Sequence, residues 1–194
     1  MAIKSRPIYN GFDLEMPAQR HIFVLEGEGA LALLEKVNPG HPRLRQSEIL
    51  YVAAGSNHTE ALNKLNVANF FDASGSEILI NRLAVILATA TMSTRIYAAG
   101  TEGFIGSVVR LGAQFGVKNA SIIKEQRGSL KRVVQCVHCK GFSHDIVASP
   151  FRCTHCNLYL FVRDHFSARL NAFQGVCVNA EEPHLQPEPV ELYQ

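Results

Sequence analysis

Two Cys-x-x-Cys pairs place the strongest constraint on how this chain folds. Cys136 and Cys139 form the first pair, Cys153 and Cys156 form the second, and thirteen residues separate the pairs. Each turn directs two thiolates toward one point, so two turns joined by a hairpin predict a tetrahedral four-sulfur cage. Zinc suits this cage because its filled d shell imposes no other geometry and thiolates are soft ligands. The spacing is that of a zinc ribbon.

Four cysteine ligands leave no open coordination position, so we expect the metal to be structural. Such a metal would stabilise a small lobe that has few core residues of its own. Turn amides and flanking cations would offset the negative charge of the centre, the cations being Lys131, Arg132, Lys140 and Arg152. Four histidines lie in the same part of the sequence and are not needed as ligands: His138, His144, His155 and His165.

Other readings of the four cysteines stay open. Four thiolates also hold a single iron or an iron–sulfur cluster, which would make the chain an electron carrier. Lys140 and Asn157 follow the second cysteine of each pair, where rubredoxin-like turns commonly have glycine, and this favours zinc. Two disulfides or four free thiols are disfavoured because nothing in the chain suggests export. The fifth cysteine, Cys177, lies between two valines and is expected to be a small buried hydrophobic residue.

The composition is that of an ordinary globular protein. Its 194 residues, 47% hydrophobic and 19% charged, suffice for one domain or two small ones. The net charge of +2 gives no general attraction to nucleic acid or anionic lipid. The N-terminal residues lack the apolar segment of a signal peptide, and the longest apolar run, Leu83–Met92, is too short to cross a bilayer. We therefore expect a cytoplasmic protein with reduced cysteines.

Short apolar runs alternate with helical patterns through the first two thirds of the chain. The expected strands are Pro7–Phe12, His21–Leu25, Glu48–Ala54, Ala68–Ala73, Thr94–Ala99 and Ala120–Lys124. The expected helices are Ala30–Val37, Asn57–Leu65, Ser76–Thr89 and Phe104–Phe115. This alternation predicts an α/β fold with a parallel, Rossmann-like sheet covered on both faces.

The pattern divides the chain into four parts. They are an extended N-terminal arm (1–20), the α/β domain (21–127), a zinc-ribbon module with a docking segment (130–180) and a flexible tail (181–194) that is rich in proline and glutamate. Within the module, Leu158–Val162 is expected to be a strand and Arg163–Phe173 a helix or turn.

Ligands of a parallel α/β sheet bind beyond the carboxyl ends of its strands. In this chain the turns at that edge are 27–29, 55–57 and 100–103. The run TRIYAAGTEGF from Thr94 to Phe104 resembles the late strand–turn–helix of ferredoxin-reductase-type flavoenzymes, and the turn at 27–29 stands where that family has a glycine-rich loop. The resemblance implies the fold of their nicotinamide-binding domain.

The positions that would hold a cofactor depart from that family's pattern. Ala99 and Thr101 replace the cysteine and the proline of the late motif, and Glu28 would put a carboxylate beside phosphate oxygens. Glu26 or Glu28 can itself take the anion position at a helix N-terminus. With only residues 1–20 ahead of the domain, we expect no flavin-binding barrel to precede it. We therefore assign no cofactor-binding residue and expect a degenerate domain that keeps the fold without the cofactor.

Three signals extend along nearly the whole chain: Ser5–Tyr9 (SRPIY), the paired cysteines with His144-Asp145 between them, and Val162–Val176 (VRDHFSARLNAFQGV). In these the chain is similar to the small zinc-ribbon subunit of bacterial dimethylamine monooxygenase. The resemblance implies a multisubunit enzyme whose other chains carry haem, FMN and an iron–sulfur cluster. The implied reaction is the NADPH- and O2-dependent N-demethylation of dimethylamine to methylamine and formaldehyde.

The segment Arg163–Phe173 mixes charged and aromatic side chains, which favours an interface. Internal packing is the alternative, and catalysis by Arg163-Asp164-His165 is the least favoured because no substrate pocket is identified. We assign no catalytic residue. Five residues are expected to dock a partner: Arg163, His165, Phe166, Arg169 and Phe173. The expected function is a docking subunit of the monooxygenase, and the alternatives are an electron-transfer or active reductase subunit and a nucleic-acid-binding zinc ribbon.

Overall fold

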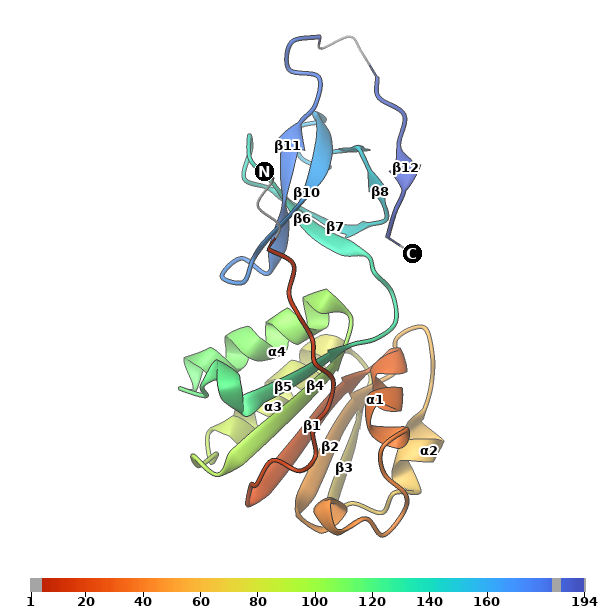
Figure 1. Cartoon of the computed structure of the whole chain (residues 1–194), viewed down its shortest axis with the longest axis vertical. Coiled ribbons are helices and arrows are strands. Elements are labelled where there is room, and N and C mark those ends of the chain that lie inside the picture. Colours follow the sequence, from red (N-terminus) through yellow and green to blue (C-terminus); the bar gives the residue numbers. More distant parts are fainter. Residues whose placement is uncertain (1–4, 183–185, 194) are drawn as a thin grey trace. The chain divides into compact units, whose positions relative to one another are not determined.

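The computed structural model describes residues 5–182 and 186–193, which form two compact units (Figure 1). We call Tyr9–Gly128 the α/β domain. We call the other unit the C-terminal lobe; it runs from Ser129 onward and includes the N-terminal stretch that ends at Ile8. Among the described residues, no helix combines the length and the apolar character needed to traverse a membrane.

The α/β domain contains one parallel sheet with the strand order β3-β2-β1-β4-β5. Its strands are β1 (Arg20–Glu26), β2 (Ser47–Val52), β3 (Asn69–Ala73), β4 (Thr94–Gly100) and β5 (Ile122–Gln126). The strand order reverses between β1 and β4, as in doubly wound folds. The predicted parallel, Rossmann-like α/β sheet is therefore confirmed.

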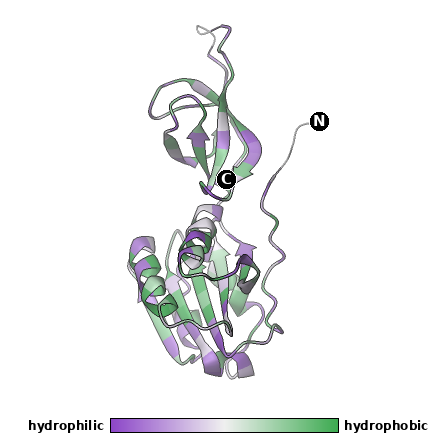
Figure 2. Ribbon diagram, turned by 90° about the vertical axis from the view of Figure 1, so that its left-hand side faces the viewer, coloured by the Kyte–Doolittle hydropathy of each residue, from purple (hydrophilic) through white to green (hydrophobic). Residues whose placement is uncertain are grey.

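Helices cover both faces of this sheet. They are α1 (Leu31–Leu34), α2 (Thr59–Asn63), α3 (Ser76–Leu87) and α4 (Glu102–Gln114), with short 3-10 helices η1 (Gly27–Ala30), η2 (Pro42–Gln46) and η3 (Asn119–Ser121). The expected helix from Ala30 to Val37 is shorter than predicted and is preceded by η1. Helices α1 and α2 pack on one face, whereas α3 and α4 pack on the other. Figure 2 shows that the central strands are strongly hydrophobic, as two-sided burial requires.

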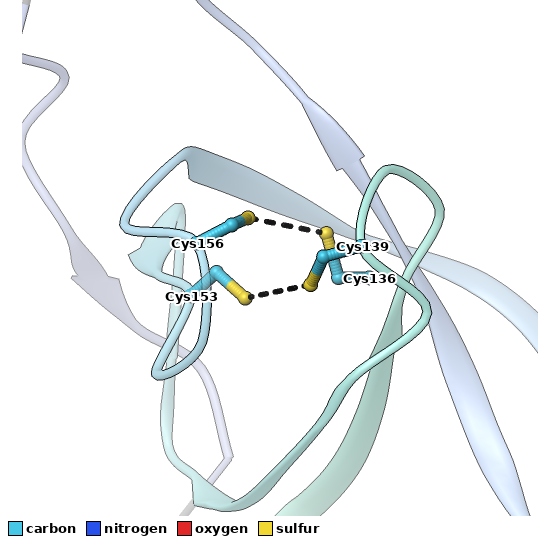
Figure 3. A group of neighbouring side chains, drawn as sticks. All are labelled: Cys136, Cys139, Cys153 and Cys156. Carbon is cyan, nitrogen blue, oxygen red and sulfur yellow. Dashed lines mark hydrogen bonds between the residues drawn. The ribbon is translucent and has the colours of Figure 1, made fainter.

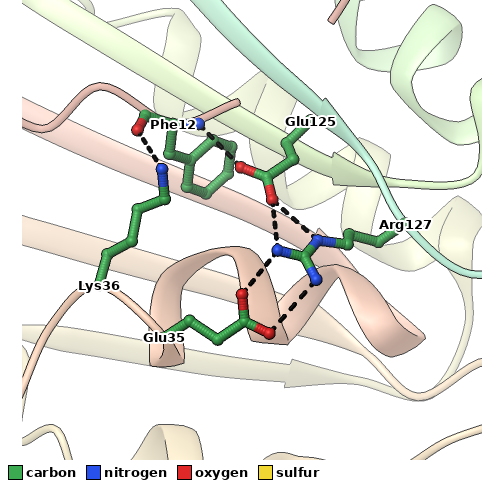
Figure 4. Close-up of polar contacts among 5 residues, drawn as sticks. All are labelled: Phe12, Glu35, Lys36, Glu125 and Arg127. Carbon is green, nitrogen blue, oxygen red and sulfur yellow. Dashed lines mark hydrogen bonds and ion pairs between the residues drawn. The ribbon is translucent and has the colours of Figure 1, made fainter. Parts of the chain in front are cut away.

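Residues of the N-terminal arm complete the hydrophobic core between the sheet and helices α1 and α2. Phe12 is 4% exposed and its ring meets the Tyr97 ring edge-on at 5.4 Å between centroids. The Phe12 N–H donates to the Glu125 carboxylate (2.8 Å), and Lys36 Nζ donates to the Phe12 carbonyl (2.6 Å). Arg127 binds the same Glu125 and reaches Glu35 at 2.7 Å (Figure 4).

The strand expected at Pro7–Phe12 is absent, since residues 6–19 contain no strand. Pro7 has no N–H to donate to a neighbouring strand, and Gly11 has a left-handed φ of 78° that turns the chain.

The C-terminal lobe contains a five-stranded sheet with the order β7-β6-β11-β10-β9. Its strands are β6 (Arg132–Cys136), β7 (Phe142–Ile146), β9 (Phe151–Arg152), β10 (Tyr159–Ser167) and β11 (Ala172–Cys177). A second, two-stranded sheet joins β8 (Ala148–Ser149) to β12 (Val190–Glu191).

Two parts of the lobe differ from the sequence-based expectation. Arg163–Phe173 is not a helix, because Arg163–Ser167 continues β10 and a turn at Asn171 (φ 51°) leads into β11. The tail is not wholly flexible, since Val190–Glu191 pairs with β8 and Tyr193 is 6% exposed in the lobe core. Tyr193 supplies apolar surface that the small lobe otherwise lacks.

The start of the described chain is part of the same lobe. Ser5 pairs with His165 in a parallel bridge, and the Ser5 N–H donates to the Asp164 carbonyl (2.9 Å). Arg6 Nε then donates to the Asp164 carboxylate (2.9 Å), which also accepts from Arg132 (3.0 Å). One carboxylate therefore joins the N-terminal arm to β6 and β10.

Candidate metal centre

The two Cys-x-x-Cys pairs form the same backbone turn twice. In the first, Cys136 N–H donates to the Gly141 carbonyl (2.9 Å), and Lys140 N–H donates back to the Cys136 carbonyl (3.0 Å). In the second, Cys153 N–H donates to the Leu158 carbonyl (2.9 Å), and Asn157 N–H donates back to the Cys153 carbonyl (3.1 Å). The pairs are therefore presented by matching turns, one after β6 and one after β9.

The residue after each pair adopts a left-handed backbone conformation, with φ of 62° at Lys140 and 60° at Asn157. This is the conformation that glycine adopts most easily. The turns thus have the shape of glycine-containing turns although neither has glycine. Residue identity at Lys140 and Asn157 consequently gives no reason to prefer zinc over iron.

The four sulfurs converge within 4.8 Å of one another (Figure 3). The Sγ atoms of Cys136 and Cys156 are 3.8 Å apart, and so are those of Cys139 and Cys153. A tetrahedron with metal–sulfur bonds of about 2.3 Å has sulfur–sulfur edges of about 3.8 Å. The residues therefore fit one tetrahedral metal ion, and they leave no position for a substrate.

Burial and amide hydrogen bonds shape the electrostatics of the cluster. Burial raises the pKa of the Cys153 thiol, but hydrogen bonds from the Cys156 and His155 amides and from neighbouring thiols bring that pKa down to about 7. For Cys136, burial prevails over the amide bonds and raises the pKa. The Leu158 amide lowers the pKa of Cys156, whereas burial and the other thiols raise it to about 12. A bound cation would replace the protons that these sulfurs share.

Contacts outside the sulfurs hold the two turns together. His155 Nε2 lies 2.8 Å from the Phe142 carbonyl, and the Ser143 and Thr154 hydroxyls are 3.0 Å apart. Among the described residues, the metal-ligand group contains the four cysteines and no histidine. Cys177 lies apart from this group and is half-buried, with its Sγ 3.5 Å from Asn179 Oδ1.

Two of the expected compensating cations, Arg132 and Lys140, have other partners. Arg132 is 6% exposed, pairs with Asp164, and lies 3.9 Å from the ring centroids of both Phe173 and Tyr193. Lys140 Nζ donates to the Val137 carbonyl within its own turn (2.6 Å). Arg132 therefore holds the lobe core together instead of offsetting charge at the sulfurs.

The five residues expected to dock a partner differ in how deeply they are buried. Phe173 is 2% exposed and packs against Phe166 with 5.1 Å between ring centroids, so Phe173 is internal and not a docking residue. Arg163, His165 and Arg169 are exposed. Phe173 therefore packs inside the lobe. For the exposed residues Arg163, His165 and Arg169, docking stays a prediction.

A second candidate site, at the carboxyl edge of the parallel sheet, is filled by the chain itself. The Glu26 carboxylate accepts hydrogen bonds from the Thr101 N–H (3.0 Å) and hydroxyl (2.6 Å) at the N-terminus of α4. A ligand phosphate at this helix end would meet a carboxylate already bound there. Glu26 and Glu28 were the acidic candidates for the helix that follows the turn at 27–29, but the helix end that Glu26 occupies is that of α4.

Neighbouring backbone also packs closely against the glycine-containing turn at residues 27–29. A Cβ atom at Gly27 would clash with the Ala54 carbonyl, and one at Gly29 would clash with the Ala99 carbonyl. These glycines let the turns after β1, β2 and β4 pack against each other. The residues at this edge therefore do not fit a dinucleotide pyrophosphate, and no chemistry is assigned to such a cofactor.

Fold and site together define a parallel α/β domain combined with a four-cysteine lobe. The chain belongs to the family described as dimethylamine monooxygenase subunit DmmA-like. The profile of that family's N-terminal domain matches residues 1–122, and the profile of its C-terminal domain matches residues 133–176.

A relative in Ectopseudomonas mendocina (strain ymp) is described as heme-dependent oxidative N-demethylase delta subunit. It is 33% identical over 107 residues, which cover 55% of this chain and 61% of the relative. The match therefore spans less than two thirds of that relative's length.

Two solved structures show a partial likeness. The ferredoxin reductase in carbazole 1,9a-dioxygenase (FAD apo form) has a TM-score of 0.41 at 16% identity, over 61% of this chain and 34% of its own. Full-length CYP116B46 from Tepidiphilus thermophilus has a TM-score of 0.45 at 18% identity, over 72% and 20%. Because both TM-scores are low, we describe the fold from the strand order of this chain alone.

Proposed function

We propose that the four cysteines hold one structural zinc ion. The observation that carries this proposal is the closed set of four sulfurs at tetrahedral separations. The metal would stabilise a lobe whose hydrophobic clusters are small. Metal analysis of the purified chain tests the proposal, with one zinc per chain as the expected result.

Iron is the second candidate, because four thiolates at these separations also hold a single iron and the left-handed turns at Lys140 and Asn157 are compatible with either metal. It would make the chain an electron-transfer subunit. Stoichiometric iron with visible absorbance would replace the zinc proposal, whereas a colourless protein with stoichiometric zinc would exclude the iron form.

We infer that the chain serves as a subunit of a haem-dependent oxidative N-demethylase and does not itself turn over substrate. The description of the relative supports the subunit role, and a four-sulfur set that leaves no position for a substrate supports the absence of turnover. In the proposed complex, other subunits carry haem, FMN and an iron–sulfur cluster. The reaction would be the NADPH- and O2-dependent conversion of dimethylamine to methylamine and formaldehyde, in the cytoplasm.

The two units would then have different tasks. The α/β domain, roughly residues 21–127, would serve as a scaffold, since Glu26 takes the position a ligand phosphate would need. The lobe, roughly residues 130–180, would dock other subunits. Co-expression with the remaining subunits tests this: we expect a stable complex whose demethylase activity depends on this chain. Activity of the isolated chain, or a fully active complex without it, would contradict the proposal.

A further inference from the structure

The last described residues of the chain lie across the core of the C-terminal lobe. Strand β12 pairs antiparallel with β8, and the Leu192 and Tyr193 amides that follow it both donate to the Val147 carbonyl (2.9 Å each). Tyr193 is 6% exposed and belongs to the hydrophobic cluster of the lobe. We call Val190–Tyr193 the strap.

A single buried side chain anchors the strap. Val190 is 57% exposed and Leu192 is 52% exposed, so neither contributes much to the core that buries Tyr193. The pairing between β12 and β8 is only two residues long. Ordering an extended segment costs conformational entropy for every residue that is fixed. We therefore expect the strap to open while the rest of the lobe stays folded.

The strap covers Arg132 without satisfying all of its hydrogen-bond donors. The guanidinium lies 3.9 Å from the ring centroids of both Tyr193 and Phe173. Arg132 is 6% exposed and its Nη2 donates to Asp164, but its Nη1 has no hydrogen-bond partner in the described part of the chain. A buried charged donor without an acceptor is unfavourable. The closed strap thus leaves a bonding position that another ligand can fill.

Charge is unevenly distributed along the lobe. Residues 129–177 contain six Lys and Arg residues and two acidic residues, whereas residues 178–193 contain four glutamates and no Lys or Arg. The charges balance only because the acidic segment that carries the strap follows a basic body, and the two are electrostatically complementary. The strap therefore shows what kind of ligand the site beneath it fits: an extended, acidic segment with one aromatic side chain.

We propose that the strap is displaceable, and that the site beneath it binds an extended acidic segment of a partner protein that carries an aromatic residue. The site consists of the edge of β8 with Arg132 and Phe173. Addition of a strand to a sheet edge is a common mode of peptide recognition, in which backbone hydrogen bonds give affinity and a side-chain pocket gives specificity. In the free chain the strap lowers the apparent affinity, because only the open fraction binds.

The test measures binding of a fluorescent peptide, with the sequence of residues 186–193, to the full chain. Tyr193→Ala removes the anchor of the strap, and Leu192→Ala is the matched control because Leu192 is 52% exposed in the same segment. We expect the peptide to bind Tyr193→Ala at least about tenfold more tightly than the unaltered chain, with Leu192→Ala within about twofold of the latter. Equal binding by all three chains would overturn the proposal.

Metal content and thermal unfolding report whether each variant is folded. Loss of the lobe's metal in Tyr193→Ala would show that Tyr193 is an integral part of the core and not a displaceable anchor, which would also overturn the proposal. The assay contains no demethylase subunit, so a negative result would leave the proposed function as a subunit untouched.

Two altered peptides test what the site recognises. Tyr193→Ala in the peptide should abolish binding to the opened chain, and Glu188→Gln with Glu191→Gln should weaken binding and reduce its sensitivity to salt. Unchanged binding of the first peptide would refute recognition of an aromatic residue, and unchanged binding of the second would refute recognition of an acidic one.

Hydrogen exchange in the unaltered chain provides a readout that needs no variant. The Leu192 and Tyr193 amides should exchange at least about tenfold faster than the Val137 amide, which donates to the Gly175 carbonyl. Equal protection would mean that the strap opens only when the lobe unfolds, and the site would then be permanently covered. A dimer that Tyr193→Ala abolishes, seen by analytical ultracentrifugation, would assign the site to the strap of a second copy instead of a partner protein.

Discussion

The Glu26 carboxylate accepts a 2.6 Å hydrogen bond from the Thr101 hydroxyl at the start of α4. Thr101 is also the N-cap of that helix, where its oxygen accepts from the Phe104 N–H. A side chain of the protein thus supplies the negative charge that a helix N-terminus attracts. The sheet edge where ligands of parallel folds bind is therefore satisfied internally.

Replacing Glu26 with alanine should expose this helix end. Loss of the two hydrogen bonds should lower the free energy of unfolding by about 1.5–3 kcal/mol. Added inorganic pyrophosphate should restore part of this loss in thermal melts of the variant and have little effect on the unaltered chain. Glu77→Ala, in the first turn of α3, is the control. An equal response of both proteins to pyrophosphate would show that Glu26 does not occupy an anion position.

Removing one of the four cysteine ligands should unfold the lobe. Metal binding contributes about 10–16 kcal/mol to folding in small zinc domains, so Cys139→Ser or a strong chelator should remove the lobe's calorimetric transition. The transition of the α/β domain should remain. Cys177→Ser is the control because Cys177 lies outside the cluster. Full metal content in Cys139→Ser would refute the four-sulfur site.

Neutralising Asp164 should loosen the N-terminal arm. Asp164→Asn leaves buried Arg132 without its charged partner, and we expect a loss of about 1.5–3 kcal/mol. Hydrogen exchange should show faster exchange at the Ser5 amide. Asp145→Asn is the isosteric control at an exposed site. Equal exchange at Ser5 in both variants would mean that the carboxylate does not hold the arm.

Asp164 also predicts a response to acid. Burial raises its pKa, but hydrogen bonds from Arg6 and Arg132 outweigh burial and lower the pKa below the usual 3.8. The stability it contributes is full above pH 3.8 and is lost as the pH falls through the folded-state pKa. Asp164→Asn should lack this acid-dependent component in unfolding curves.

Protonation of His21 should destabilise the α/β domain at a higher pH than the pH at which Asp164 is protonated. Burial, with Arg43 nearby, lowers its pKa below 6.5, and its Nδ1 lies 3.1 Å from the Tyr97 hydroxyl. The unfolded chain takes up the proton first, so stability is full above about pH 6.5 and falls as the pH drops toward the folded-state pKa. His21→Phe should flatten this dependence between pH 7 and 5, measured by urea unfolding, whereas exposed His144→Gln should not.

Local sequence signals predicted most of the α/β domain. The segments Ile22–Leu25 and Ile96–Ala99 are buried from both faces of the sheet, so their continuous apolar character marked the runs that contain them as strands. The cysteine spacing likewise predicted which sulfurs meet. These features depend on neighbours in sequence or on a repeated motif.

Features that depend on distant residues were not predictable in the same way. Ser5 and His165 are 160 positions apart, and no local pattern indicates that they pair. Arg163 to Phe173 was expected to be helix or turn because its charges obscure the alternation of buried Val162 with exposed Arg163. The left-handed backbone at Lys140 and Asn157 was likewise not indicated by the sequence, because neither position is a glycine.

Ser5–Ile8 and the described residues from Ser129 onward form one compact unit, so the α/β domain is in effect an insertion within the lobe's chain. A fragment that starts at Ser129 therefore lacks Ser5–Ile8, which belong to the same compact unit. Joining Ser5–Ile8 to that fragment through a short linker would restore the missing segment and give an independently expressed lobe.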